Sequence, residues 1–202
     1  MAIKLVLFDA AGVLFPVNKV VGEDIAQQLQ LDEEELVQKM WKGFYVDYTR
    51  GTISTEQFFD RFAETFNVPR EQVTEALFTD GFIKALVLTP GIDTVLKKLM
   101  EANVIVAILS DTTEIFARAR DILHLNQYFD RTFLSFEIGH KKPEPEAFQV
   151  VLDHYGVRSE EVFFIDDNKT NVEAAQKMGI QAVLFTNADL LTKALQTADV
   201  LR

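Results

Sequence analysis

The sequence has no cysteine and only 3 histidines among its 202 residues. The absence of cysteine excludes a disulfide framework, a thiolate metal site and a cysteine nucleophile. The longest apolar runs, such as residues 104–109, are far shorter than the roughly 20 residues that a membrane-spanning helix requires. Residues 1–12 also lack the order of basic, apolar and small residues that marks a secretory signal. We therefore expect a cytoplasmic protein with no membrane partner.

Positive charge is scarce as well. The chain carries 20 Lys and Arg against 31 Asp and Glu, a formal net charge of −11. Most of its surface would repel a polyanion, so we expect no nucleic-acid partner. A small anion can bind only where a local cation or metal ion reverses the field. The remaining composition, with 48% hydrophobic residues, is that of a folded protein with a sizeable core.

With only 5 prolines and 9 glycines, no linker, repeat or low-complexity stretch marks a domain boundary. The two ends of the chain nevertheless read as alternating strands and helices. Strands are predicted at residues 3–8, 104–109, near 133, 162–165 and 182–185, and helices at 92–102, 113–123, 146–155 and 172–178. This succession favours right-handed crossovers and an open parallel sheet, which is an α/β fold.

Between these parts, from about residue 20 to 85, the pattern is purely helical. One helix is expected from the spacing of Val21 and Ile25, and a longer one from the acidic cluster 32–35 through Tyr48. Ser54 forms a capping box three residues before Gln57, and Pro69 is expected at the first position of a further helix. We therefore predict an α/β core of residues 1–15 and 88–202, interrupted by a helical insertion of residues 16–87.

Polar residues follow the predicted strands where each strand ends. Asp9 follows the first, Ser110 and Asp111 follow the second, and Asp166 and Asp167 follow the fourth. Lys142 lies in a connection between these strands. Ligands of open α/β sheets bind beyond the carboxyl ends of the strands. Hard oxygen ligands without imidazole or sulfur suit Mg²⁺.

Four ordered stretches together resemble the haloacid dehalogenase (HAD) superfamily. They are residues 8–14 (FDAAGVL), 109–111 (LSD), 139–145 (GHKKPEP) and 164–168 (FIDDN), the last followed by NVEAA at 171–175. The resemblance spans nearly the whole chain, and the helical insertion matches the family's first-position cap. It implies a Rossmann-like core with an all-helical cap that opens and closes on hinges near residues 15–17 and 86–89.

The resemblance also implies roles for the acidic residues. Asp9 would be the nucleophile that attacks phosphorus and forms an aspartyl-phosphate. Asp166, together with Asp9 and the main-chain carbonyl of Ala11, would hold Mg²⁺. Asp167 would orient the metal shell from outside or ligate through water.

The remaining site residues are expected to contact the substrate. Ser110 would donate a hydrogen bond to a phosphoryl oxygen, and Lys142 would neutralise the developing charge while pairing with Asp9. Asp111 is expected beside them in the substrate-binding crevice. Trp41 and Tyr45 would line the non-phosphate part of the substrate if their helix faces the crevice; helix packing is the alternative.

One position departs from the family's phosphatase pattern. The second aspartate, which usually protonates the leaving group, is replaced by Ala11. General acid–base help is worth about 10²- to 10⁴-fold in rate. Three explanations are open: a substrate with a good leaving group, another acid such as His140, or a relative that binds phosphate without turnover.

A fourth explanation is metal-independent 2-haloacid dehalogenation, because a halide leaves without protonation. The adjacent carboxylates of Asp166 and Asp167 favour the phosphatase, since like charges crowded near Asp9 would be costly without a cation. We therefore expect a Mg²⁺-dependent phosphatase, monomeric or homodimeric, acting on a small phosphorylated metabolite. The dehalogenase and the non-catalytic phosphate-binding protein remain the alternatives.

Overall fold

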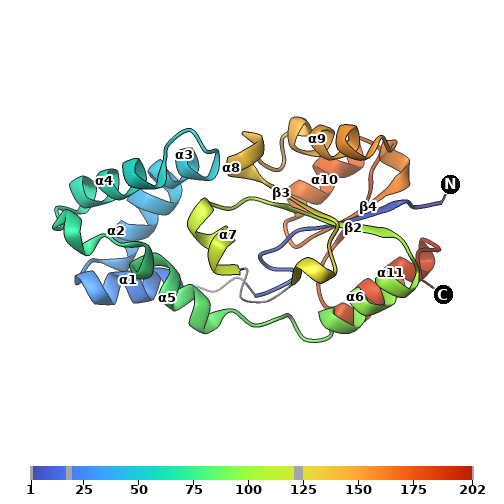
Figure 1. The fold of residues 1–202 in the computed structure, drawn as a ribbon, viewed down its shortest axis with the longest axis horizontal. Helices are drawn as coiled ribbons and strands as arrows, with labels where there is room; N and C mark the ends of the chain where they lie inside the picture. Colours follow the sequence, from blue (N-terminus) through green and yellow to red (C-terminus); the bar gives the residue numbers. More distant parts are fainter. Residues whose placement is uncertain (1, 17–19, 121–124, 202) are drawn as a thin grey trace.

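The computed structural model describes residues 2–16, 20–120 and 125–201 (Figure 1). Its centre is a five-stranded sheet in the order β3-β2-β1-β4-β5, in which every neighbouring pair is parallel. The strands are β1 (Leu5–Phe8), β2 (Ile105–Ser110), β3 (Arg131–Leu134), β4 (Val162–Asp166) and β5 (Gln181–Leu184). The predicted open parallel sheet of an α/β fold is therefore confirmed.

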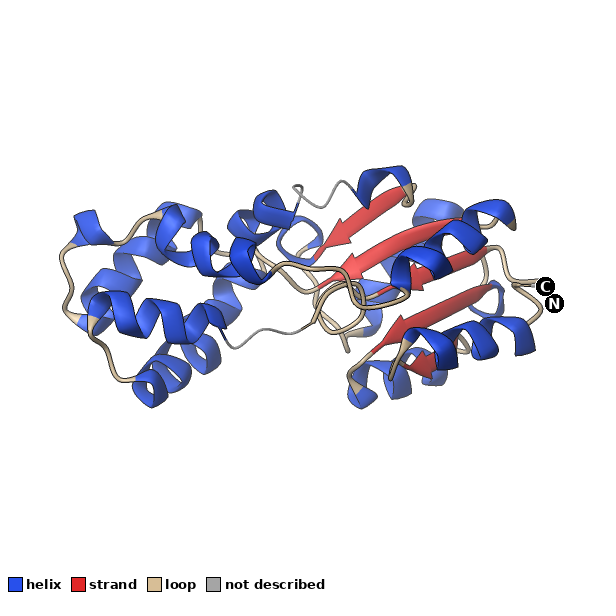
Figure 2. Cartoon of the chain, turned by 90° about the horizontal axis from the view of Figure 1, so that it is seen from below, coloured by secondary structure: helices blue, strands red, loops and turns tan. Residues whose placement is uncertain are grey.

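Helices cover both faces of this sheet (Figure 2). In β1, Val6 and Phe8 face the helices α6 (Ile92–Glu101) and α11 (Ala188–Thr197), whereas Leu5 and Leu7 face α9 (Pro145–Tyr155) and α10 (Lys169–Lys177). Successive strand residues point to opposite faces, so a strand covered twice must be apolar throughout. This explains why β1 is a continuous hydrophobic run.

Between β1 and α6, residues 20–85 form a separate helical layer at the left of Figure 1. Its segments are α1 (Val20–Leu29), α2 (Glu33–Leu36), a π-helical stretch (Val37–Phe44), α3 (Tyr45–Thr49), α4 (Thr55–Phe66), a 3₁₀ turn (Arg70–Gln72) and α5 (Glu75–Ala85). We call these residues the helical insertion. Its interior is aromatic: Phe58 stacks on Tyr48 with ring centroids 4.6 Å apart and contacts Phe78 at 5.2 Å.

Two predictions within the insertion are wrong. The long helix from 32 to 48 is interrupted, because Gly43 takes a non-helical conformation (φ −102°, ψ −117°) that its missing Cβ permits. Pro69 does not open a long helix but precedes the 3₁₀ turn, and α5 begins at Glu75, where Thr74 accepts a hydrogen bond from the Leu77 amide at 3.3 Å. The predicted capping box of α4 is confirmed, with both Ser54–Gln57 hydrogen bonds formed.

The core elements match the predicted ranges closely, with three differences. Helices α8 (Ser135–Ile138) and α11 are absent from the sequence prediction. The described part of the helix expected at 113–123 is α7 (Glu114–Arg120), and residues 121–124 lie outside the described residues. Residue 17, in the first expected hinge, also lies outside the described residues. The domain boundaries and both hinges stay predictions.

In the part of the chain that the structure describes, no helix is both long and apolar enough to cross a membrane.

Before β4, the side chain of Glu161 collects three hydrogen-bond or ion-pair partners. The backbone amide of Arg158 donates to it at 3.0 Å, the Arg158 guanidinium approaches at 3.2 Å, and Lys4 Nζ lies at 2.8 Å. These contacts, led by the backbone hydrogen bond, lower the pKa of Glu161 to about 2. A depressed pKa of a carboxyl group stabilises the fold above the unfolded-state pKa and loses this effect as the pH falls through the folded-state value.

We therefore expect Glu161→Gln to lower the melting temperature at pH 7. The difference from the wild type should shrink below about pH 4.5, the ordinary value of a glutamate, and vanish towards pH 2. The matched control is Glu160→Gln, because the Glu160 side chain is 43% exposed, against 8% for Glu161, and its Oε1 lies 3.4 Å from Nη1 of the same arginine. A loss that is equally large at pH 7 and pH 3, measured by thermal denaturation, would contradict the assignment.

Candidate active site

Three acidic side chains meet where β1 and β4 end. Asp9 directly follows β1, Asp166 is the last residue of β4, and Asp167 comes next. Each offers a carboxylate oxygen, and these oxygens all lie within 4.8 Å of one another. β1 and β4 are neighbours in the sheet, so their carboxyl ends lie side by side. The structure thus brings together the three acidic groups that the sequence analysis assigned to the metal site.

Lys142 reaches this cluster from the loop between α8 and α9. Its Nζ lies 2.5 Å from Asp9 Oδ1 and 2.9 Å from Asp166 Oδ2, and only 2% of its side chain is exposed. Burial by itself would lower the pKa of Lys142, but Asp9 and Asp166 raise it above its usual range. Lys142 is therefore a buried ammonium that bridges two carboxylates.

Asp166 is held in one orientation by the start of α10. The Asn168 amide donates to its Oδ1 at 2.7 Å, and Asn171 Nδ2 donates to its Oδ2 at 3.0 Å. Asn168 also caps α10, since its side chain accepts from the Thr170 amide at 2.9 Å. The same turn that begins the helix therefore fixes the carboxylate.

Asp167 can approach the cluster only because residue 12 is glycine. Gly12 has φ +89°, and a Cβ placed there would lie 2.1 Å from Asp167 Oδ2. The turn that follows Asp9 is closed by a hydrogen bond from the Gly12 amide to the Phe15 carbonyl at 2.7 Å. The roles of the Ala11 carbonyl and of Asp167 at a metal ion stay predictions.

The cluster carries more negative than positive charge. Burial raises the pKa of Asp9 to about 7, and the charge of Asp166 adds to this effect while Lys142 opposes it. One ammonium faces three carboxylates, so a divalent cation would relieve the repulsion. Carboxylate oxygens are also the ligands that Mg²⁺ prefers. Asp9, Asp166 and Asp167 therefore fit a Mg²⁺ site.

The end of β2 supplies the neighbouring polar groups. Ser110 is only 3% exposed. Asp111, predicted to contact substrate, accepts a hydrogen bond from the Lys142 backbone amide at 3.1 Å and so positions the lysine loop. Burial raises the pKa of Asp111. No sequence motif pointed to Ser135, whose hydroxyl accepts a hydrogen bond from the Thr112 amide at 3.0 Å and donates one to the Thr112 carbonyl at 3.1 Å.

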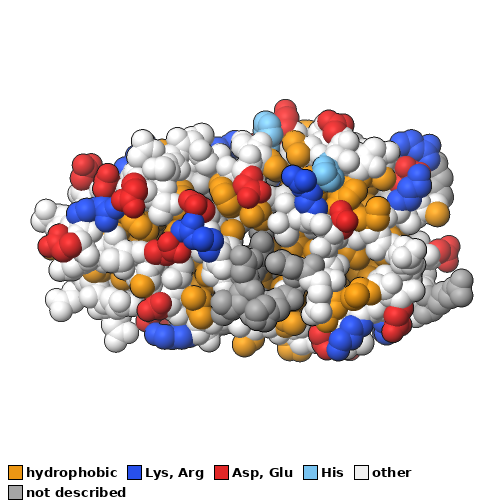
Figure 3. Space-filling model, viewed as in Figure 1, with side chains coloured by type: hydrophobic (Ala, Val, Ile, Leu, Met, Phe, Trp, Pro, Cys, Tyr) orange, Lys and Arg blue, Asp and Glu red, His pale blue; other side chains and the backbone are white. Residues whose placement is uncertain are grey.

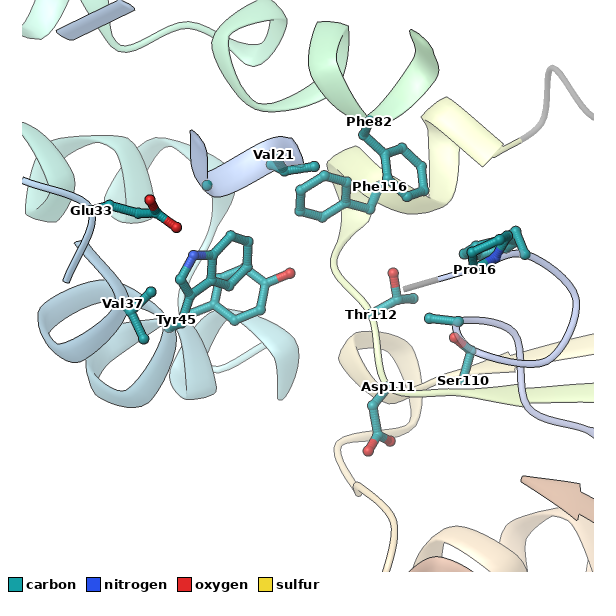
Figure 4. Close-up of a pocket in the computed structure, with 14 residues that line it drawn as sticks. Pro16, Val21, Glu33, Val37, Tyr45, Phe82, Ser110, Asp111, Thr112 and Phe116 are labelled. Atoms are coloured by element: carbon teal, nitrogen blue, oxygen red, sulfur yellow. The ribbon is translucent and has the colours of Figure 1, made fainter. Parts of the chain in front are cut away.

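A cavity of about 540 Å³ opens between these strand ends and the helical insertion (Figure 4). It is lined by Ala11, Phe15, Pro16, Val21, Gly22, Glu33, Val37, Trp41, Tyr45, Phe82, Ser110, Asp111, Thr112 and Phe116. Trp41 and Tyr45 therefore line the crevice, as their predicted role requires. Sequence reasoning missed Phe82 and Phe116, because helical spacing of aromatic residues ordinarily indicates packing.

His140 is not among the residues that line this cavity. Its side chain is 42% exposed, and its Nδ1 lies 3.9 Å from Glu144. Lys141, which directly precedes Lys142, donates from Nζ to Thr49 Oγ1 at 2.8 Å. The described polar contacts of these two residues are with Glu144 and Thr49, and the role of His140 as an alternative acid stays a prediction.

The loop that carries Lys142 also anchors the insertion. Arg50 donates to Glu144 from both terminal guanidinium nitrogens, Nη1 and Nη2, and Lys141 donates to Thr49 as described. Gly51 packs so closely that a Cβ there would lie 2.1 Å from the carbonyl oxygen of Phe136. Figure 1 shows α3 beside α8 at this junction. Insertion and core are thus joined within a few residues of the buried lysine.

A family model of haloacid dehalogenase-like hydrolases matches residues 3–179. The chain belongs to this family. The match includes the sheet strands β1 to β4, the insertion and all four strand-end motifs. The resemblance drawn from the sequence is therefore confirmed.

Solved structures of HAD enzymes share this fold. A HAD family enzyme from Bacteroides thetaiotaomicron superposes with a TM-score of 0.83 at 26% identity, over 96% of this chain and 99% of that one. A second structure of that enzyme, in complex with magnesium and inorganic phosphate, gives a TM-score of 0.76 at 28% identity, over 92% and 96% of the two chains.

Curated relatives differ in activity. Flavin mononucleotide hydrolase 1 of Arabidopsis thaliana is 43% identical over 75 residues, which is 37% of this chain and 31% of that protein. (S)-2-haloacid dehalogenase 4A of Burkholderia cepacia is 26% identical over 90% of this chain and 82% of that protein. Flavin mononucleotide hydrolase 1 is thus covered over only 31% of its length, and two further curated relatives, a rat bifunctional epoxide hydrolase 2 and the drimenol cyclase of Aspergillus calidoustus, over 21% and 36%.

Proposed function

We propose that this HAD-like hydrolase is a Mg²⁺-dependent phosphatase that transfers the phosphoryl group of a small metabolite to Asp9. The observation that carries the proposal is the cluster of Asp9, Asp166 and Asp167, with oxygens within 4.8 Å, bridged by the buried Lys142. A relative with magnesium and phosphate bound, similar over nearly its whole length, supports the same conclusion.

In the proposed reaction an Asp9 carboxylate oxygen attacks phosphorus, and the bond from phosphorus to the leaving oxygen breaks with its electron pair. Lys142 offsets charge on Asp9, and the buried Ser110 donates a hydrogen bond to a phosphoryl oxygen. Water then cleaves the aspartyl-phosphate and restores Asp9. When bound by Asp9, Asp166 and Asp167, Mg²⁺ supplies positive charge that allows an anionic ester to approach a carboxylate. The insertion would act as a cap that limits access of water.

The leaving group must depart with little help from the protein. Ala11 lines the cavity beside Asp9, at the position where the family's phosphatases carry an acid. A leaving group that is stable as an anion, such as that of an acyl phosphate, needs no proton donor. We therefore propose substrates with good leaving groups.

Ala11 is also the observation that favours the second candidate, 2-haloacid dehalogenation, since a halide leaves unprotonated. The extended similarity to a haloacid dehalogenase supports this candidate. Against it stands the excess of clustered carboxylates, two of them buried, which calls for a cation that a halide displacement does not use.

The experiment compares phosphate release from acetyl phosphate and from ethyl phosphate, with Mg²⁺ or with EDTA, for the wild type and Ala11→Asp. We expect Mg²⁺-dependent release from acetyl phosphate by the wild type. Ala11→Asp should raise release from ethyl phosphate by about 10²-fold and leave acetyl phosphate within about tenfold, because only the alkoxide needs an acid.

Two outcomes would contradict the proposal. Chloride release from 2-chloropropionate that persists in EDTA and disappears in Asp9→Asn would establish the dehalogenase. Turnover of neither acetyl phosphate nor ethyl phosphate by the wild type, with Mg²⁺-dependent turnover in Ala11→Asp, would establish a binding protein that has lost its reaction. Thermal denaturation of both variants controls for folding.

A further inference from the structure

The part of the cavity that lies away from the strand ends is built from aromatic and aliphatic side chains. Trp41 and Tyr45 form one pair, with ring centroids 4.5 Å apart at 70°, and Phe82 and Phe116 form another at 4.9 Å and 68°. Figure 4 shows Tyr45 on one side of the space and Phe82 with Phe116 on another. Such walls recognise rings, because aromatic pairs gain energy beyond the area that they bury. Binding a phosphate group does not require these aromatic side chains.

The charges that line this cavity also favour an uncharged ring. Its charged lining residues, in the part of the chain that the structure describes, are Glu33 and Asp111, and both are acidic. Glu33 lies on the side of the insertion, far along the cavity from Ser110 (Figure 4). A second anionic group on a substrate that reached Glu33 would be repelled by its carboxylate. A neutral ring avoids this cost.

The leaving group supplies an independent argument. A phenolate or an aromatic carboxylate is a far more stable anion than an alkoxide, so it departs without an acid. Ala11, which supplies no acid, lines the same cavity as the aromatic pairs. The chemistry at one end of the cavity and the walls at the other therefore select the same kind of molecule.

We propose that the substrate is an aromatic phosphate, an aryl or aroyl monophosphate whose ring enters the aromatic part of the cavity and which bears no second anionic group. The proposal rests on the phosphatase function proposed above, and it names the substrate class of that site. The ring would pack between the Trp41–Tyr45 pair and the Phe82–Phe116 pair, with its phosphate directed towards Asp9.

Trp41 offers a direct test, because it is the one tryptophan of the chain and lines the cavity. Its fluorescence is titrated, in the presence of Mg²⁺, with benzylphosphonate and with methylphosphonate, which cannot be hydrolysed. We expect benzylphosphonate to bind at least about tenfold more tightly, since burying a ring is worth more than that factor. Equal affinities of the two phosphonates would overturn the proposal.

The effect of a second anionic group on binding is tested with a matched pair of probes. We expect 4-carbamoylbenzylphosphonate to bind more tightly than 4-carboxybenzylphosphonate, and Glu33→Gln to reduce the difference by a few-fold. Glu33 is exposed in the first turn of α2, so this variant should fold. Tighter binding of the carboxylate than of the amide by the wild type would overturn the proposal.

Turnover measurements distinguish a failure of the phosphatase proposal from a failure of the aromatic-substrate proposal. Benzoyl phosphate and acetyl phosphate are both acyl phosphates with stable leaving groups, so they differ mainly in the ring. We expect a KM for benzoyl phosphate at least about tenfold lower, and Phe116→Leu to raise that KM several-fold more than it raises the KM for acetyl phosphate. Mg²⁺-dependent turnover without a preference for the ring would refute the aromatic substrate and leave the phosphatase standing. Ring-selective phosphonate binding without any turnover would refute the phosphatase and support the ring-binding cavity.

Discussion

Asp9→Asn is expected to lower Mg²⁺-dependent phosphate release from acetyl phosphate by at least about 10⁴-fold, the scale of removing a nucleophile from a group of residues that act together. An amide oxygen carries no full negative charge, so no covalent bond to phosphorus forms. The fold should persist, because the change removes one charge from a cluster with an excess of carboxylates. Initial rates at saturating substrate measure the effect.

The matched control is Asp153→Asn. Asp153 is an exposed residue of α9 whose only described polar contact is with Gln149, one helical turn away at 2.7 Å. Its rate should equal that of the wild type. If Asp9→Asn retained more than about a hundredth of the wild-type rate at an unchanged melting temperature, Asp9 could not be the nucleophile.

Lys142→Met is expected to have the second large effect, on both rate and stability. Methionine keeps much of the volume of the side chain but leaves Asp9 and Asp166 buried without their shared cation. Breaking a buried ion pair in this way costs about 3–5 kcal/mol. The rate should fall by about 10³-fold, because charge on the transferred phosphoryl group loses its partner.

The sequence provides a control in the adjacent lysine. Lys141→Met removes the same charge from a side chain that bonds Thr49 and not the acidic cluster. We expect less than about 1 kcal/mol of destabilisation and a rate within a few-fold of the wild type. Addition of Mg²⁺ should restore part of the melting temperature of Lys142→Met. Equal effects of the two lysine variants, by calorimetry and initial rates, would show that Lys142 has no special role.

Much of the site could be predicted because it depends on topology. Once Asp9 and Asp166 were placed at the ends of parallel strands, the sheet had to bring them to one edge. Lys142 followed from the family motif, because its loop is distant in sequence and no periodicity points to it. The sheet itself was predictable since strands covered on both faces are continuous apolar runs.

What could not be predicted depends on side-chain packing across the chain. The close approach of Asp167 to Gly12 could not be predicted, because a glycine in a turn does not indicate which distant residue packs against it. The break at Gly43 belongs to a helix whose apolar spacing looks continuous. Phe82 and Phe116 line the cavity from two helices, and helical spacing alone cannot distinguish a side chain that lines a cavity from one that packs in the core. Tertiary packing decides each of these cases.

The junction of Arg50 with Glu144 gives the site a mechanical connection that the sequence did not suggest. The loop 141–144 contributes the buried lysine and also the residues that hold the insertion. Any movement of the insertion would therefore act on the backbone next to Lys142. The proposed closure of the cap and the position of the ammonium are linked through this loop.

The most direct test of the account is a search for the phosphoryl group on Asp9 itself. The enzyme is mixed with acetyl phosphate and Mg²⁺, quenched in acid within the first turnover, and digested for mass spectrometry. We expect the peptide that contains Asp9 to gain one phosphoryl group, to lose it on further incubation, and to gain none in EDTA. Phosphate release without a phosphorylated Asp9, or a phosphoryl group on another residue, would contradict the account.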